Sequence, residues 1–353
     1  MHGGGGFGQA RVFGGAHEQA QIGQAELHRG ILASLRNFRR VLAKNADCCC
    51  GAVGKTMPAM TTTHPTNPAA APELSAWVGR TEDRADLLAC APAQGLAATL
   101  DRDDGAYVAG TELPPLWHWL YFLPMARQSE LGPDGHPKRG GFLPPVPLPR
   151  RMWAGSRLDW HAPLRLGETV TRHSRIVSVE QKSGRSGALV FVCVRHEYAN
   201  AQGVALTEEH DIVYRDLPVP GAPAAAPVSA PQPAPAGGWM RTIVPDDVLL
   251  FRYSALTFNG HRIHYDRRYV TEVEGYPGLI VHGPLCATLM VDLVRRQLPA
   301  ARLAHFSFKA VAPVFDIAPF AVCGQPEADG KTIKLWVQHD DGSLAMTGTA
   351  TLV

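Results

Sequence analysis

Four strand-like segments occur twice in this chain of 353 residues, once on each side of a tract rich in alanine and proline. Each segment is rich in β-branched or aromatic residues and is bounded by glycine or charged turns, which is the pattern of a β-strand. The repeated order indicates two similar units. The first set covers residues 157–166, 168–182, 188–203 and 204–216, and the second covers 305–315, 317–327, 331–342 and 343–353.

Short sequence matches between the two sets support an internal duplication. HAPL at 161–164 corresponds to VAPV at 311–314, and GVALT at 203–207 corresponds to SLAMT at 343–347. Each pair occupies the same place in its half, namely the turn into an edge strand and the start of the last strand. We infer two units, each a helix wrapped by an antiparallel sheet, and therefore an α+β fold.

The chain before residue 73 lacks this pattern. Residues 1–59 contain a glycine run and a basic, weakly amphipathic piece, LHRGILASLRNFRRVLAKN. Such a segment is typical of a transit peptide, but it also fits an upstream extension of the reading frame with the true start at Met57 or Met60. The Ala/Pro tract is typical of a semi-rigid linker. The predicted parts are a disordered or spurious extension (1–72), an N-terminal unit (73–217), a linker (218–238) and a C-terminal unit (239–353).

The composition excludes several classes of function. The net charge is only +2, so nothing favours nucleic acid as a partner. No apolar run approaches the roughly 18–20 residues of a membrane span. The seven cysteines lack the paired spacing of a zinc site or a disulfide framework, so we expect no metal and a reducing, cytoplasmic setting.

The first unit begins with elements that are less regular than its strands. Residues 75–100 are expected to form helical pieces broken at Pro92, and PPLWHWLYF at 114–122 is expected to form a short aromatic helix. A long irregular loop, 124–151, follows. Loops of this length inside a compact domain are usually either functional or disordered.

The second unit holds the stretch with the clearest chemistry, residues 251–297. A polar loop carries Asn259, His261, His264 and Asp266, and apolar residues recur at helical spacing after Gly283. The proline that follows this glycine is favoured at a first helical position, which places Gly283 at a helix N-terminus. Backbone N–H groups there lack partners and carry partial positive charge, so the stretch has an acid/base group beside an oxyanion donor.

Two long strings in this stretch, YSALTFNGHRIHYD and EGYPGLIVHGPL, resemble the MaoC-type hydratases and dehydratases. They are most similar to the two-domain branch that holds mesaconyl-C4-CoA and itaconyl-CoA hydratases and 3-hydroxyacyl-thioester dehydratases of the mitochondrial type. The resemblance covers residues 74–353. It implies a tandem (double) hotdog fold and a hydro-lyase that needs no cofactor and acts on a 2-enoyl or 3-hydroxyacyl thioester of CoA or acyl carrier protein.

The resemblance also implies roles for three residues. His264 matches the acid/base histidine, and an imidazole suits proton transfer near neutral pH. Gly283 matches the glycine whose N–H donates a hydrogen bond to the thioester oxygen. Asn259 stands where the wider family has an aspartate, and an amide can orient water but cannot accept its proton. Asp266 or His261 is near enough in sequence to act as the partner of His264 instead.

A basic cluster in the long loop of the first unit is the candidate for binding a phosphate or carboxylate of the substrate. It contains His136, Lys138, Arg139, Arg150 and Arg151. His282, directly before the oxyanion glycine, is a further candidate for this site, although we expect it to pack or to orient backbone rather than to react.

Two other functions remain open from the sequence. A hotdog thioesterase generally places a carboxylate on the helix that opens the site, and residues 284–290 contain none. A non-catalytic subunit that binds acyl thioesters is the second alternative, and the joint presence of His264 and Gly283 argues against it. The acyl group stays undetermined. The oligomeric state also stays undetermined, with a homodimer among the assemblies left open, and the mitochondrial matrix is the expected compartment if the chain is eukaryotic.

Overall fold

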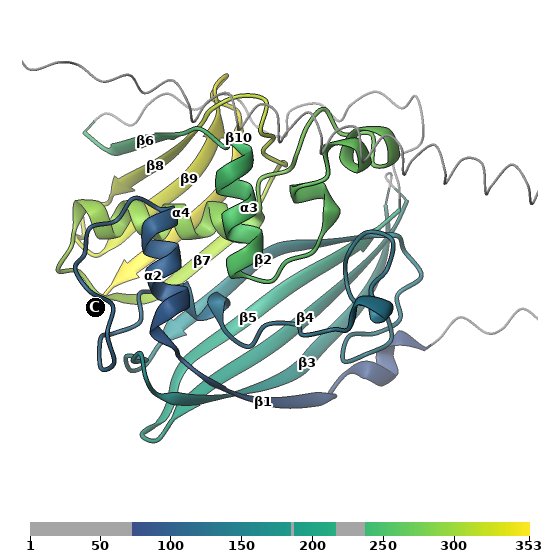
Figure 1. Cartoon of the computed structure of the whole chain (residues 1–353), viewed down its shortest axis with the longest axis horizontal. Helices are drawn as coiled ribbons and strands as arrows, with labels where there is room; N and C mark the ends of the chain where they lie inside the picture. Colours follow the sequence, from purple (N-terminus) through teal and green to yellow (C-terminus); the bar gives the residue numbers. More distant parts are fainter. Residues whose placement is uncertain (1–72, 185–186, 217–236) are drawn as a thin grey trace, which may run out of the picture. The chain divides into compact units, whose positions relative to one another are not determined.

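The computed structural model describes residues 73–184, 187–216 and 237–353, and in these residues ten strands form one antiparallel sheet (Figure 1). The strand order is β1-β3-β4-β5-β2-β7-β10-β9-β8-β6. The N-terminal strands are β1 (Thr81–Leu87), β2 (Arg150–Trp160), β3 (Thr169–Gly184), β4 (Gly187–Asn200) and β5 (Gly203–Arg215). The C-terminal strands are β6 (Trp239–Ile243), β7 (Leu303–Ala310), β8 (Phe320–Pro326), β9 (Thr332–His339) and β10 (Leu344–Leu352).

The two halves of the sheet meet where β2 pairs with β7. Reading outward from this seam, the order is β2, β5, β4, β3, β1 on one side and β7, β10, β9, β8, β6 on the other, so the halves mirror each other. Gly155 lies at the seam opposite Lys309, and a Cβ added to it would lie 2.4 Å from the carbonyl oxygen of Phe308. Only glycine therefore allows the two backbones to approach this closely.

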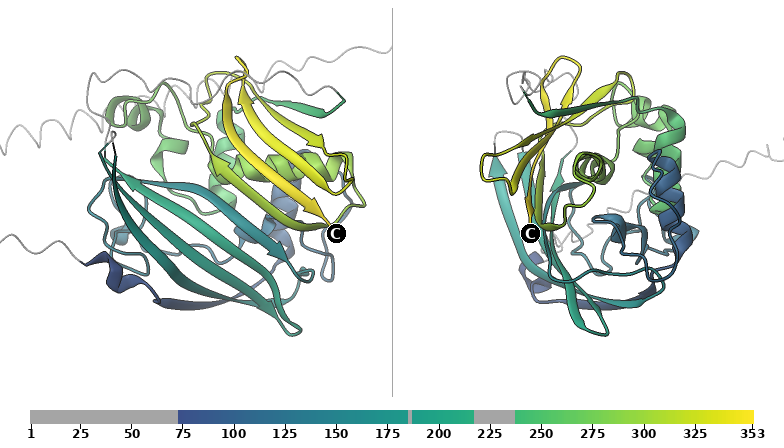
Figure 2. Two further views of the ribbon diagram at one scale, coloured as in Figure 1. Left: turned by 180° about the vertical axis from the view of Figure 1, so that it is seen from behind. Right: turned by 90° about the vertical axis from the view of Figure 1, so that its left-hand side faces the viewer.

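Three α-helices and several short helical turns cover one face of the sheet. The α-helices are α2 (Cys90–Thr99), α3 (Asp247–Leu256) and α4 (Gly283–Gln297), and the short elements are η1 (Leu74–Trp77), η2 (Trp117–Leu120), η3 (Gln128–Glu130), η4 (Arg262–His264) and the π-helical η5 (Tyr269–Val273). Helix α4 lies against the C-terminal strands, while α2 packs beside α3 (Figure 2). Every residue of α4 from Leu285 to Val294 is buried, so α4 is the central helix of its half.

These features confirm the predicted α+β class and the tandem arrangement of two wrapped sheets. The boundaries of the units stay a prediction. The extension 1–72 lies outside the described residues, and so does the linker 218–238 except for its last two residues. Among the described residues, no helix has the length and apolar character needed to cross a membrane.

Two expectations for the first half were wrong. Residues 81–87 form strand β1 rather than a helix, because alternate side chains of TEDRADL face solvent on an edge strand that pairs only with β3. Pro92 does not break a helix. It lies in the first turn of α2, where its missing N–H would have had no helical partner.

The aromatic segment 114–122 is only partly helical. A single 3-10 turn, η2, forms in it, because Leu116 and Phe122 adopt left-handed backbone angles (φ of 70° and 55°) that an α-helix does not allow. The segment is nevertheless buried, with Trp117 and Leu120 in the main core. In the first half, the side chains of this aromatic segment therefore pack against the sheet, whereas in the second half α4 does so.

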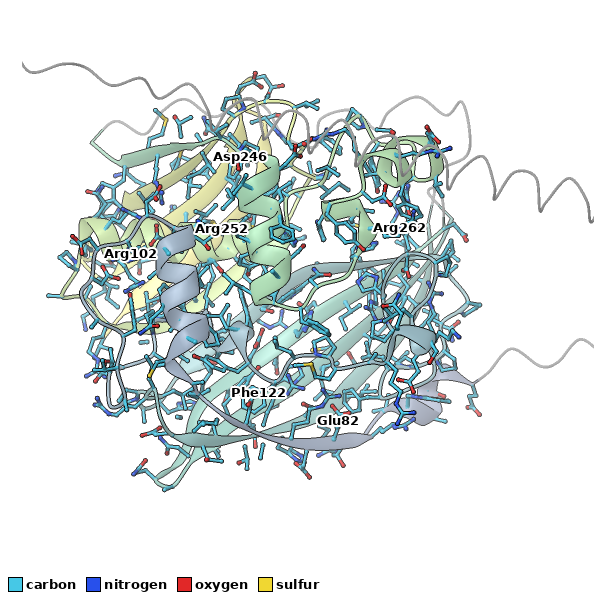
Figure 3. The ribbon with its side chains drawn as sticks, viewed as in Figure 1. Glu82, Arg102, Phe122, Asp246, Arg252 and Arg262 are labelled. Atoms are coloured by element: carbon cyan, nitrogen blue, oxygen red, sulfur yellow. The ribbon has the colours of Figure 1, made fainter. Side chains whose placement is uncertain are left out.

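A buried carboxylate on α4 ties the two halves together. Asp292 is 1% exposed and accepts hydrogen bonds from Arg102 (2.6 Å), Arg241 (2.7 Å) and Arg296 (2.7 Å). Arg102 follows α2 in the first half (Figure 3), whereas the other two arginines belong to the second. A buried carboxylate with three guanidinium partners has its charge fully compensated.

Candidate active site

The polar loop after α3 is shaped by its own backbone contacts. Helix α3 begins at the cap residue Asp246, which accepts a hydrogen bond from the N–H of Leu249 at 2.8 Å. After the helix ends, the N–H of Asn259 donates to the carbonyl of Ser254 (2.8 Å), and its side-chain oxygen accepts from the N–H of His261 (3.0 Å). The Nδ2 group of Asn259 has no partner among the described residues, so it is available to a water or a substrate.

His264 is held in one tautomer within this loop. Its Nδ1 lies 2.7 Å from the carbonyl oxygen of Ile280, and a carbonyl can only accept, so Nδ1 carries the proton. Nε2 is therefore the unprotonated atom that can accept a proton. The residue is 7% exposed, and this burial lowers the pKa of His264 to about 4, against the opposing effect of the hydrogen bond to Ile280. At neutral pH the ring is uncharged and can act as a base.

His282 is the direct ring neighbour of His264. The two rings are stacked with their centroids 3.8 Å apart, and His282 is fully buried. Its Nε2 lies 2.8 Å from the hydroxyl of Ser254, and burial keeps the pKa of His282 well below its usual range. We expect His282 to position His264 rather than to touch the substrate. A direct contact between His282 and the substrate stays a prediction.

Gly283 follows His282 and is the first residue of α4, with Pro284 beside it in the first turn. The stacking of His282 on His264 thus brings the start of α4 next to the candidate base. Partial positive charge collects at a helix start, because the first N–H groups have no partners within the helix. The N–H of Gly283 can therefore stabilise negative charge on a thioester oxygen while His264 moves a proton.

Asp266 has a different set of contacts. One carboxylate oxygen accepts from the N–H of Tyr269 at 3.0 Å and the other from Arg262 at 2.7 Å, so Asp266 caps the helical turn that leads into η5. His261 contacts the base, with its ring edge-on to that of His264 and 5.5 Å between the ring centroids. Burial, followed by the charges of nearby histidines and Arg151, lowers the pKa of His261 strongly, so this ring is also neutral.

The lysine and the three arginines of the basic cluster differ in their contacts. Lys138 donates to the carbonyl of Ser129 (2.9 Å), and Arg139 donates to the carbonyls of Val146 and Pro149 (2.6 Å each). Arg150 forms a largely buried ion pair with Glu274 and lies over the ring of Tyr276. Arg151 lies opposite Tyr214 in the pairing of β2 with β5 and forms no ion pair with a carboxylate of the described residues. Their assignment as substrate ligands stays a prediction.

The loop of the first unit, which was expected to bind the substrate, also contacts the polar loop through residues for which no such contact was predicted. Asp134 and His136 lie against His261, and potential ligand atoms of the three residues lie within 4.8 Å of one another. Two imidazoles and a carboxylate could in principle hold a divalent cation. No spacing rule could have found this set, because its members come from two distant loops that the fold brings together.

The first half also holds a buried carboxylate that was not among the predicted functional residues. Glu208 on β5 is 1% exposed and accepts hydrogen bonds from four side chains, those of His118 (3.1 Å), Trp119 (3.2 Å), Ser156 (3.1 Å) and Tyr198 (3.3 Å). Burial alone would raise the pKa of Glu208, but the hydrogen bond and charge of His118 and the neighbouring histidines lower it to about 2. The one sign of this network in the sequence was a glutamate, Glu208, at an inward-facing position of a strand.

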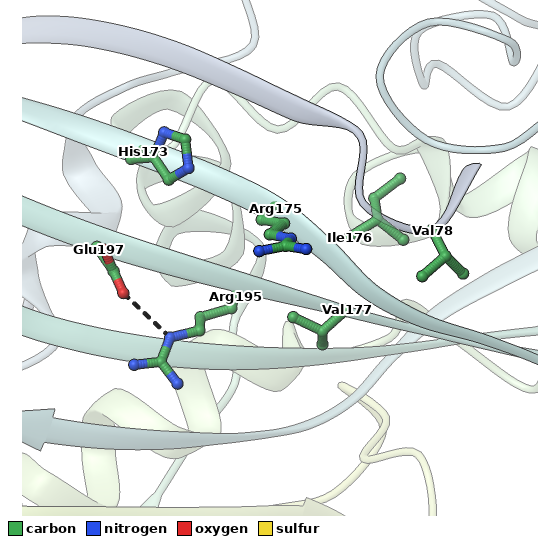
Figure 4. Close-up of a pocket in the computed structure, with 7 residues that line it drawn as sticks. All are labelled: Val78, His173, Arg175, Ile176, Val177, Arg195 and Glu197. Atoms are coloured by element: carbon green, nitrogen blue, oxygen red, sulfur yellow. Dashed lines mark hydrogen bonds and ion pairs between the residues drawn. The ribbon is translucent and has the colours of Figure 1, made fainter. Parts of the chain in front are cut away.

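The pocket drawn in Figure 4 lies elsewhere. Most of its lining residues belong to β3 and β4, among them the exposed His173 and Arg195 and the half-buried Glu197. None of the candidate residues of the polar loop lines it. It is a shallow depression on the outer face of the sheet.

Comparison with known proteins decides the family. A family model described as hydroxyacyl-thioester dehydratase type 2 matches residues 116–316, which is more than half of the chain. The chain belongs to this family. The matched region contains Asn259, His264 and Gly283, so the whole candidate site lies within it.

Individual members of the family and of its fold agree with this result. Mesaconyl-C(4)-CoA hydratase of Chloroflexus aurantiacus is 50% identical over 78% of this chain and 97% of its own length. The mitochondrial hydroxyacyl-thioester dehydratase type 2 of Schizosaccharomyces pombe is 27% identical over 65% of this chain and 81% of its own length.

Two solved structures show the same fold at low identity. A MaoC-like dehydratase of Phytophthora capsici has a TM-score of 0.56 at 13% identity and covers 79% of this chain and 97% of its own. HtdX of Mycobacterium tuberculosis has a TM-score of 0.53 at 17% identity and covers 78% of this chain and 100% of its own. The predicted family, the tandem hotdog fold and the class of enzyme are confirmed: the chain is a hydro-lyase that adds water to, or removes it from, an acyl thioester.

Proposed function

We propose that this chain hydrates the C4 thioester of mesaconate with CoA and catalyses the reverse dehydration. The single observation that carries the assignment is the 50% identity to a hydratase of that name over 97% of its length. The placing of His264 beside the start of α4 supports it, because the reaction needs one proton carrier and one oxyanion donor.

The proposed steps use three residues of the chain. Asn259 holds a water through its free Nδ2 group, and Nε2 of His264 takes a proton from that water. The oxygen bonds to the β-carbon, and the electron pair of the double bond moves toward the α-carbon and the thioester oxygen. The N–H of Gly283 stabilises the resulting enolate, and His264 returns the proton to the α-carbon. The contacts of Asp266 with Arg262 and Tyr269 support Asn259 as the partner of His264.

A substrate panel tests this proposal. The enoyl-thioester absorbance should fall fastest with mesaconyl-C4-CoA, more slowly with itaconyl-CoA and slowest with crotonyl-CoA, and without release of thiol. Release of free CoA would identify a thioesterase instead, and a chain that binds the thioesters without either change would be a binding subunit. Helix α4 does not favour a thioesterase, since its one acidic residue, Asp292, is held by three arginines.

The proposal also covers the carrier of the acyl group, the assembly of the enzyme and its compartment. CoA rather than acyl carrier protein is the proposed carrier, because the Chloroflexus relative is named for a CoA thioester. We propose a homodimer in the cytoplasm, or in the mitochondrial matrix if the chain is eukaryotic, as the names of the yeast relatives suggest. Measuring the molar mass in solution and comparing crotonyl-CoA with crotonyl carrier protein would test the assembly and the carrier.

A further inference from the structure

The loop of the first unit is in backbone contact with the polar loop of the second. The N–H of Arg262 (labelled in Figure 3) donates to the carbonyl of Asp134 at 2.9 Å, and its guanidinium donates to the carbonyl of Pro133 at 3.0 Å. A Cβ added to Gly135 would lie 1.9 Å from the carbonyl oxygen of Gly260, so this position must be glycine. The contact therefore holds the residues on either side of Gly135 against the polar loop.

Three potential metal ligands meet across this contact. Asp134 and His136 flank Gly135, His261 follows Gly260, and one ligand atom of each of the three side chains lies within 4.8 Å of the others. The ring of His136 packs against that of His261 with 4.0 Å between the centroids. Oδ2 of Asp134 and Nδ1 of His136 are 3.1 Å apart. Two ligands of a tetrahedral zinc, with bonds of about 2.0–2.1 Å, are separated by a similar distance, roughly 3.3–3.5 Å.

All three side chains have electron pairs to give to a cation. Burial lowers the pKa of His136 and of His261, so both rings are neutral at neutral pH. Neither ring nitrogen of His261 has a hydrogen-bond partner among the described residues, and none of their lysines or arginines lies within ion-pair distance of Asp134. The side chains of His136 and Asp134 are 20% and 30% exposed, so an ion can reach them from solvent.

The donor set determines which kind of ligand fits. A carboxylate among the three side chains disfavours an anion, and imidazole nitrogens favour zinc and similar transition metals over Mg²⁺ or Ca²⁺, which prefer oxygen. The charges of Arg151 and Arg139, which also lower the pKa of His136, oppose a cation, so binding requires the negative charge of Asp134. The expectation of no metal rested on the spacing of the cysteines, and this set contains none.

We propose that Asp134, His136 and His261 bind Zn²⁺ or a similar transition-metal ion, which fastens the loop of the first unit to the polar loop. The ion takes the place of the proton between Asp134 and His136, and the ring of His136 then carries its proton on Nε2. A small side-chain rotation brings His261 to the ion, and water fills the fourth position. The ion contacts no reacting atom. It acts through His261, whose ring contacts His264 and whose N–H donates to Asn259.

Competition for Zn²⁺ with a chromophoric chelator tests the proposal. The full chain is used, with the three cysteines at 48–50 replaced by serine so that their thiols do not compete. We expect one Zn²⁺ per chain, and His136→Asn and Asp134→Asn should each weaken binding by at least about 10- to 100-fold, the loss that even an outer-shell partner of a ligand causes. The matched control is His173→Asn, which should leave the affinity unchanged. His173 is exposed and pairs with Asp83 at 2.6 Å, but it belongs to no group of three such ligands in the described chain.

Hydrogen exchange gives a second measurement that locates the ion. Zn²⁺ should slow amide exchange in residues 133–137 and 259–264 of the parent chain and should have no such effect on His136→Asn. Circular dichroism checks that each variant folds. His261→Gln changes the other loop, so loss of Zn²⁺ by folded variants of both loops assigns the ion to the contact between them.

Three results would overturn the proposal. The first is a parent chain that binds no Zn²⁺, the second is an affinity that folded His136→Asn and Asp134→Asn variants retain, and the third is protection confined to other segments. Neither measurement depends on turnover, so failure of the proposed hydratase activity would be seen separately in the substrate panel.

Discussion

The imidazole of His264 lies parallel to that of His282, with 3.8 Å between the ring centroids and 19° between the planes. Both rings are buried, and the ring of His282 is held to α3 by the contact between its Nε2 and the hydroxyl of Ser254. The stack links the polar loop to the first residue of α4. A shift of either element would therefore change the distance between the base and the oxyanion donor.

Replacing the candidate base should remove most of the activity. We expect His264→Ala to lower kcat by about 10²–10⁴, the usual range for a positioned acid/base group, without a comparable change in KM. The matched control is His305→Ala, since His305 lies on β7 away from the site and pairs with Asp159. A loss of less than about tenfold in His264→Ala would mean that another group moves the proton.

The pH profile of kcat/KM should have its acid limb near pH 4. The pKa of His264 is lowered to about 4, and the ring must be neutral to take a proton from water, so activity should fall as the pH drops through this value. An unperturbed histidine would lose activity near pH 6.5 instead. Circular dichroism must accompany the assay, because the lowered pKa values of His264 and His210 also make the folded state less stable as the pH falls from about 6.5 to 4.

The partner of His264 can be identified with three variants. Asn259→Asp should stay active or gain activity, because it adds a carboxylate with little change in volume, and Asn259→Ala should cost less than His264→Ala. Asp266→Asn should keep most of the activity, since the amide oxygen can still cap the N–H of Tyr269. Steady-state kinetics of the three variants decides the matter. Loss of turnover in Asp266→Asn together with an inert Asn259→Asp would make Asp266 the partner.

Asp292→Asn should destabilise the chain strongly. It leaves three arginines without their shared counter-ion at a site where the carboxylate is 1% exposed. Breaking such a buried arrangement from one side costs about 3–5 kcal/mol in the free energy of unfolding. Denaturant unfolding would measure it, with the exposed Asp159→Asn as control, which should change the free energy by less than about 1 kcal/mol.

The sequence predicted the second half more accurately than the first. Helix α4 and strands β7 to β10 lie where the apolar spacing placed them, and the same spacing put Gly283 at a helix start. Strand β1 was missed because four of its seven residues are charged (Glu82, Asp83, Arg84 and Asp86), so the segment lacks the alternation of apolar and polar residues that marks a strand. The start of β2 at Arg150 was missed because the prolines before it hide the strand pattern.

The candidate site was predictable only along a single stretch of the chain. His264, Asn259 and Gly283 could be found because they lie within one loop and one helix. His136 could be named as a member of the basic loop, but its place beside His261 and the part of Asp134 could not be predicted, because both depend on the contact of Gly135 with Gly260, which no local pattern encodes. The network around Glu208 depends on partners from several strands and loops in the same way.

The pairing of β2 with β7 has a consequence for how this enzyme can be divided or rebuilt. If the two halves were produced as separate polypeptides, each would present a long row of unpaired backbone N–H and C=O groups at the place where its neighbour had been. Open edges of this kind recruit other strands and lead to aggregation. We expect the halves to remain insoluble alone and to recover a catalytic site only when they are co-expressed, so that each closes the edge of the other.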